Sequence, residues 1–146
     1  MSPLAAFLTA DGRDHAGRSY ADILAMSDAE LERHHDFIQW IFPLPEPSRA
    51  APGAQVLSVA DIAAAKASGV ALARLTAGAA RMSAFYRQQS AWLAPYDHNH
   101  LRITRIIRSL RLLVGDAAAD DFRARILVLA EGAPISPEAR KFWAAA

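Results

Sequence analysis

The helical character of this chain is clearest in residues 27–47, SDAELERHHDFIQWIFPLPEP. At the start of this stretch, Ser27 and Glu30 have the spacing of a capping box, in which each side chain satisfies a backbone N–H of the first helical turn. At its end, alternate prolines fix φ and remove backbone donors, so a helix cannot continue through them. The pattern predicts one helix over residues 28–42, followed by an irregular Pro-rich loop over residues 43–57.

The same start signal recurs on both sides of this stretch. Ser19 and Ser58 each precede an acidic residue by three positions, which predicts short helices near 20–26 and 59–67. Ser136 is followed by proline at the first helical position, which predicts a last helix through Trp143. Apolar residues at helical spacing predict three longer helices, over residues 70–91, 99–114 and 116–130.

No segment of useful length alternates between apolar and polar residues, as a half-buried strand would. We therefore predict an all-α fold, a single compact helical bundle of about seven helices. The length of 146 residues suits one domain covering residues 1–146. A hydrophobic fraction of 53% with 21% charged residues is typical of a globular chain rather than a disordered one.

Several functional classes are disfavoured by composition. The chain has no cysteine, which excludes disulfides and thiolate chemistry. It lacks both the pattern of a signal peptide and a run of roughly 18 apolar residues that could cross a membrane. We therefore expect a cytoplasmic protein without a transmembrane segment. The net charge of +1 is small, so a nucleic-acid partner is not expected.

His35 occupies an unusual position in the helix predicted over residues 28–42. The apolar stripe of that helix contains Leu31, Ile38 and Phe42, and His35 falls on the same stripe. One interpretation is a core histidine bonded to a carbonyl or carboxylate, because buried polar groups find partners. The alternatives are a histidine that lines a binding site and a metal ligand.

Residues 98–112, HNHLRITRIIRSLRL, contain four arginines at intervals of three residues. Each is turned by about 60° from the previous one, so they spread over half of the helix. The interspersed leucines suggest that this helix is covered on more than one side, and covered arginines need partners. The candidate partners are Asp36, Glu46, Asp97, Asp120 and Asp121. Either Arg102 and Arg105 fix the bundle through carboxylates and carbonyls, or they bind a carboxylate or phosphate ligand.

Trp40 lies off the stripe that contains Leu31 and Ile38, immediately before the Pro-rich loop. Alternate prolines favour an extended, pre-organised path, so this loop should cross the bundle as a strap. Trp40 then either packs under the strap or is exposed to a partner, and we favour packing.

Two long blocks carry a family resemblance. Residues 35–48, HDFIQWIFPLPEPS, resemble the signature of the opioid growth factor receptor conserved domain, and residues 98–112 are similar to the second block of that family. Shorter matching pieces lie at residues 14–18, 27–32, 134–136 and 142–143. Together the resemblance spans residues 7–143, in the order that the family shows.

The resemblance implies a binding role rather than a chemistry. Animal members of the family are described as receptors for the pentapeptide met-enkephalin that act as negative growth regulators. This alanine-rich sequence looks like a bacterial, domain-only member, for which an opioid peptide is not the expected ligand. The resemblance supplies no catalytic residue, so none is assigned, and we expect neither a cofactor nor a bound metal.

Three functions are compatible with the sequence. The preferred one is a module that binds a peptide or a small ligand bearing a carboxylate or phosphate. Whether the protein is an enzyme stays open, and we favour a protein without catalytic activity. One alternative is a metal-dependent hydrolase using His35, Asp36 and His98. The other is a structural homodimer with Trp92, Leu93 and Tyr96, or the last helix, at its contact. The candidate ligand-binding residues are His35, Gln39, Trp40, His98, Asn99, Arg102 and Arg105.

Overall fold

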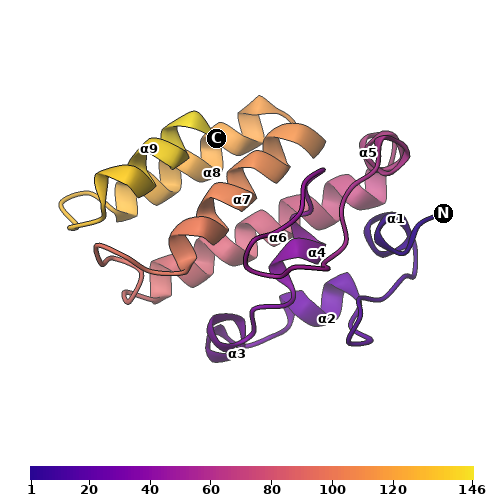
Figure 1. The fold of residues 1–146 in the computed structure, drawn as a ribbon, viewed down its shortest axis with the longest axis horizontal. Coiled ribbons are helices and arrows are strands. Elements are labelled where there is room, and N and C mark those ends of the chain that lie inside the picture. Colours follow the sequence, from indigo (N-terminus) through magenta and orange to yellow (C-terminus); the bar gives the residue numbers. More distant parts are fainter. The chain divides into compact units, whose positions relative to one another are not determined.

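The computed structural model describes residues 1–146, which form nine helices and no strand, so the predicted all-α class is confirmed (Figure 1). None of the helices combines the length and hydropathy needed to span a bilayer. The chain divides into two compact units, residues 1–78 and 79–146. The helices are α1 (Pro3–Thr9), α2 (Tyr20–Leu24), α3 (Asp28–Arg33), α4 (Ile38–Ile41), α5 (Val59–Lys66), α6 (Gly69–Gln88), α7 (Asn99–Leu113), α8 (Asp116–Leu129) and α9 (Pro137–Ala145).

The predicted capping boxes are present. Ser19, Ser27 and Ser58 each accept a hydrogen bond from the backbone N–H three residues later, and the acidic side chain at that position accepts the N–H of the serine. The start of α9 is capped by the Ser136 hydroxyl, with proline at the first helical position as predicted. These local signals fix where helices begin because they satisfy donors that a helix start leaves unpaired.

Two predictions about helices were wrong. Residues 28–42 form two helices, α3 and α4, because the chain turns into an extended conformation at His34 (φ −81°, ψ 133°). The histidines and aspartate after Arg33 have modest helix propensity, and the turn lets Phe37 become fully buried. His35 is consequently exposed in the connection and does not lie on a buried helical stripe. The second error is that helix α1 was not predicted. Ser2 caps this helix, and proline occupies its first position.

The core of the N-terminal unit is aromatic. Phe7 of α1 packs against Tyr20 and Trp40, with ring centroids 5.3 Å apart in both pairs. The Tyr20 hydroxyl donates to the carbonyl of Ile41 at 2.9 Å, and burial raises the pKa of this phenol far above its ordinary range. Helix α1 contacts α4 and α5, so the first helix of the chain holds α4 in place.

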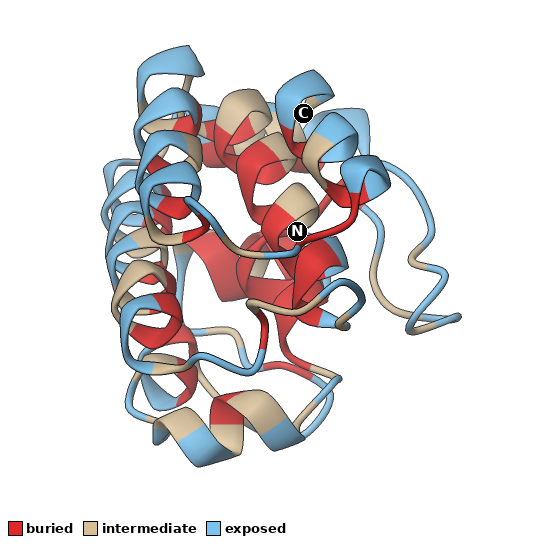
Figure 2. Ribbon diagram, turned by 90° about the vertical axis from the view of Figure 1, so that its left-hand side faces the viewer, coloured by how far each residue is buried: buried red, intermediate tan, exposed pale blue.

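The C-terminal unit packs α7 against α8 and α9, which lie alongside it in Figure 1. Ile103, Ile106, Ile107 and Leu110 of α7, which recur at the helical spacing that predicted this helix, are fully buried. Several helices of the protein are buried on one side and exposed on the other, as the colours of Figure 2 show. This distribution is the expected consequence of amphipathic helices covering a core.

Candidate functional site

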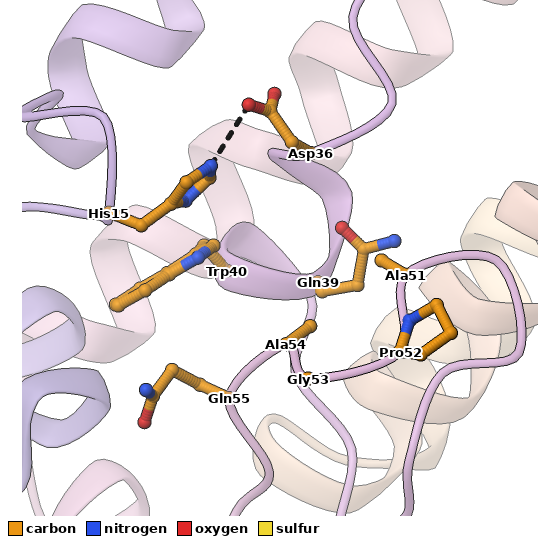
Figure 3. Close-up of a pocket in the computed structure, with 9 residues that line it drawn as sticks. All are labelled: His15, Asp36, Gln39, Trp40, Ala51, Pro52, Gly53, Ala54 and Gln55. Atoms are coloured by element: carbon orange, nitrogen blue, oxygen red, sulfur yellow. Dashed lines mark hydrogen bonds and ion pairs between the residues drawn. The ribbon is translucent and has the colours of Figure 1, made fainter.

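The N-terminal unit contains a cavity of about 270 Å³ (Figure 3). One wall comes from α4 and the residues before it, and the other comes from the loop that follows the prolines. A histidine from the turn between α1 and α2 completes the site. The lining residues are His15, Asp36, Gln39, Trp40, Ala51, Pro52, Gly53, Ala54 and Gln55.

A buried ion pair anchors the turn that carries His15. Oδ1 of Asp14 accepts the backbone N–H groups of Ala16 and Arg18, and Oδ2 lies 2.7 Å from Nε of Arg18. The Asp14 side chain is completely buried and that of Arg18 is 18% exposed. Gly17 adopts φ 79°, which closes the turn in a conformation that favours glycine. The turn is therefore fixed by its own short sequence.

Asp36 receives two partners from this turn. Nε2 of His15 lies 2.9 Å from Oδ2 of Asp36, and Nη2 of Arg18 lies 3.1 Å from Oδ1. Burial by itself would raise the pKa of Asp36, but the hydrogen bonds and charges of Arg18 and His15 outweigh it and lower the pKa. The side chain of Asp36 is still 46% exposed, so the carboxylate is ionised and accessible beside the cavity.

Gln39 is the unusual residue of the site. Its side chain lines the cavity, the residue is only 2% exposed, and Oε1 has no hydrogen-bond partner. A buried polar atom without a partner costs about 1–3 kcal/mol. Such atoms are rare in native proteins and each needs an explanation.

Trp40 lies next to Gln39 on α4 and is 5% exposed. The His15 ring lies nearly parallel to the indole, with an interplanar angle of 21° and centroids 6.2 Å apart (Figure 3). Phe7 contacts the indole edge-on. The preferred interpretation, that Trp40 packs instead of projecting outward, agrees with this burial.

The opposite wall is a short turn within the predicted loop. Ser48 Oγ accepts the N–H of Ala51, the N–H of Ala54 bonds to the carbonyl of Ala51, and Gly53 has φ 88°. Further along, the N–H of Leu57 bonds to the carbonyl of Leu44, so the two ends of the loop meet. The loop therefore contributes this turn, which includes Gly53, to the cavity.

Of the other sequence candidates, His35 lies in the N-terminal unit outside the cavity lining, and the rest lie in the C-terminal unit. Asn99 and Arg102 are buried, with exposures of 1% and 5%, whereas Arg105 is half-buried and His98 is exposed. Asn99 accepts a hydrogen bond from the Tyr86 hydroxyl and donates to Asp97. These contacts give Asn99 a structural role at the start of α7.

Neighbouring aromatic residues are also committed to packing. Trp92 is fully buried and its indole N–H donates to the carbonyls of Tyr86 and Gln89, so this side chain is not available for the dimer face predicted from it. The Trp143 N–H donates to the carbonyl of His100, whose Nε2 lies 2.8 Å from the carbonyl of Trp92. Tyr96, in contrast, is 82% exposed.

Of the carboxylates predicted to pair with the arginines of α7, Asp120 pairs with Arg111 as predicted, whereas Asp36 and Asp121 pair with arginines outside α7. Asp36 pairs with Arg18 in the N-terminal unit, Asp120 pairs with Arg111 and Arg123, and Asp121 pairs with Arg125. No group of three or more His, Asp or Glu side chains is arranged to hold a metal ion. The arrangement of side chains therefore does not support the alternative of a metal-dependent hydrolase.

Gln39 and Trp40 were predicted from the sequence as ligand-binding residues. His15, Asp36 and Arg18 were not. The contact between His15 and Asp36 joins positions 21 residues apart, which no local pattern reveals. The Asp14–Arg18 pair carried a usable signal, since a carboxylate and a guanidinium four positions apart flank a glycine-containing turn.

The chain is similar to known proteins over part of its length. Residues 24–89 match the family described as "Opioid growth factor receptor (OGFr) conserved region", a range that contains α4 and the loop of the cavity. The chain is 31% identical over 115 residues to the opioid growth factor receptors of Rattus norvegicus and Mus musculus, an alignment that covers 66% of the chain. It spans only 19% and 17% of those two proteins. No solved structure matches. The chain therefore contains the conserved region of the opioid growth factor receptor family, at residues 24–89.

Proposed function

We propose that this chain is a binding module and that the cavity beside α4 holds its ligand. One observation carries the proposal: the buried amide oxygen of Gln39 has no partner within the protein, although its side chain lines a cavity. A ligand that supplies a hydrogen-bond donor removes the cost of this unpaired atom. The buried indole of Trp40 and the network around Asp36 give the amide rigid surroundings, which favours specific recognition.

The size and character of the cavity favour a short peptide segment or a small molecule. Its volume of about 270 Å³ lies just below the usual range of ligand sites, roughly 300–1,000 Å³. Alanine and proline side chains supply apolar contact on one wall, and an amide and a carboxylate supply polar contact on the other. A few polar groups on an apolar background are typical of such sites.

The family relationship supports a receptor-like role in general terms. The two mammalian relatives are named as receptors for an opioid growth factor, and the matched range includes Asp36, Gln39 and Trp40. Because the chain spans less than a fifth of their length, binding of an opioid peptide is only one hypothesis for it. A peptide ligand of some kind is the part of the relatives' role that this cavity best accommodates.

Two further roles remain hypotheses of the sequence. An anion could bind at Arg102 and Arg105, and the chain could form a homodimer through an exposed surface. Size measurement in solution distinguishes the dimer, because a constitutive dimer has about twice the 15.8 kDa mass of the chain. Binding at the arginines would perturb signals of α7 and leave those of α4 unchanged.

The proposal is tested by ¹H–¹⁵N correlation spectra of the whole chain during titration with met-enkephalin and with a library of tripeptides. The indole N–H of Trp40 reports on the cavity, whereas those of Trp92 and Trp143 are bonded within the C-terminal unit and serve as internal controls. We expect at least one peptide to shift Trp40 while the two controls stay in place. A set of binders that shifts only α7 or the controls would refute the proposed site.

A further inference from the structure

We infer that the cavity beside Gln39 binds a primary ammonium group, such as the free amino terminus of a short peptide. The inference rests on the proposed function, because it names the chemistry of the ligand for the same cavity. It differs from the expectation drawn from the arginine-rich helix, which pointed to a carboxylate or phosphate.

Charge around the cavity selects against an anion. No lysine or arginine lines it, and its one carboxylate is Asp36. The guanidinium that contacts Asp36, that of Arg18, is bound to both Asp14 and Asp36. Arg18 therefore offers its one positive charge to two carboxylates, those of Asp14 and Asp36. A carboxylate or phosphate ligand beside Asp36 would therefore meet a negative charge and no lysine or arginine in the lining, whereas an ammonium is attracted.

Hydrogen-bonding capacity points the same way. Asp36 has accessible acceptor surface, with 46% of its side chain exposed, and Gln39 has an amide oxygen without a donor. Figure 3 shows both side chains at the cavity. An ammonium carries three donors and no acceptor, so it complements two acceptors at once. Charged donors bound to carboxylates also form stronger hydrogen bonds than neutral donors do.

The amide of Gln39 needs only a local adjustment to take part. Its oxygen is buried beneath the cavity surface. The last torsion of a glutamine side chain is broad and lacks steep barriers, so the amide can rotate to present its oxygen to the ligand. Asp36, three positions earlier, is held by His15 and Arg18 and provides the fixed half of the site.

Three alanine tripeptides of different charge test the inference on the whole chain. The first has a free amino terminus and an amidated carboxyl end. The second is acetylated and amidated, hence neutral, and the third is acetylated with a free carboxylate. Binding is followed through the Trp40 indole N–H and the Gln39 side-chain amide in ¹H–¹⁵N spectra. We expect the first peptide to bind at least tenfold more tightly than either of the others.

Two variants complete the test. Asp36→Asn removes the carboxylate, so it should weaken the cationic peptide at least tenfold and leave the neutral peptide unchanged. Asp11→Asn is the matched control, because Asp11 is an exposed carboxylate of the same unit outside the cavity, and binding should not change. Equal loss of both peptides in Asp36→Asn would assign the residue a structural role and overturn its part in recognition.

The outcomes separate the two proposals. If the neutral peptide binds at Trp40 within tenfold of the cationic one, or if the anionic peptide binds best there, the ammonium inference is overturned while the cavity remains a binding site. If none of the three peptides, met-enkephalin or the tripeptide library shifts Trp40, both the inference and the proposed function are overturned.

Discussion

Nε of Arg18 lies 2.7 Å from Oδ2 of Asp14, and the same guanidinium reaches Asp36 at 3.1 Å. Arg18 thereby connects a completely buried carboxylate with one at the rim of the cavity. The position of the His15 ring over Trp40 depends on this connection, because Asp14 fixes the turn that carries His15.

Asp14→Ala should destabilise the protein by about 2–4 kcal/mol. The substitution leaves two backbone N–H groups without their acceptor and removes the partner of a largely covered guanidinium. Urea unfolding checks the prediction, with Asp11→Ala as the control that should change stability by less than about 0.5 kcal/mol. An unchanged unfolding midpoint for Asp14→Ala would show that the pair does not hold the turn.

Gly78→Ala should also destabilise the protein, by about 1–3 kcal/mol, although alanine favours a helix by about 1 kcal/mol over glycine. A Cβ at this position would lie 2.7 Å from the Tyr20 hydroxyl and 3.2 Å from the Phe42 ring. The hydroxyl cannot move freely because it donates to the carbonyl of Ile41.

Gly69→Ala is the matched control for that substitution. Gly69 belongs to the same helix, and a Cβ there meets no atom within 4 Å, so its stability should stay the same or rise. Thermal unfolding of the two variants side by side separates crowding from helix propensity. Stabilisation by both substitutions would contradict the close contact with Tyr20.

The stabilising contribution of Asp36 should disappear in acid. Arg18 and His15 hold the pKa of Asp36 below its ordinary value against the opposing effect of burial. A carboxylate with a depressed pKa in the folded state stabilises the protein above the unfolded value, about pH 4, and loses this effect as pH falls through the folded pKa. The difference in stability between the native chain and Asp36→Asn should therefore shrink as the pH falls below about 4. A difference that persists unchanged at pH 2 would mean that ionisation of Asp36 is irrelevant.

The parts of the fold that follow from local signals were predictable. Each S-x-x-acid sequence starts a helix as expected, because the serine and the acid satisfy backbone donors within four residues. The apolar face of α7 was also predictable from its period, since burial of that face follows from spacing alone. In both cases the determining interactions lie close in sequence or repeat regularly.

The break between α3 and α4 was not predictable in this way. Apolar spacing continues through residues 31–42 as if one helix ran there, yet the chain leaves the helix at His34 and buries Phe37. Packing of α4 against α1 decides this geometry, and α1 is distant in sequence. For the same reason, the contact between His15 and Asp36 could not be predicted from the sequence, and neither could the cavity beside it. Gln39 and Trp40 of the cavity were already candidates.

The central claim is that the Gln39 amide serves a ligand and not the fold, and the stability of Gln39→Leu tests it most directly. Leucine has a similar volume and removes a buried oxygen that lacks a partner. The variant should therefore be about 1–2 kcal/mol more stable than the native chain in urea, and it should lose binding at the cavity. The control Gln88→Leu, at an exposed position, should change stability by less than about 0.5 kcal/mol. Destabilisation of Gln39→Leu by more than about 1 kcal/mol would show that the amide supports the fold, and would contradict the account.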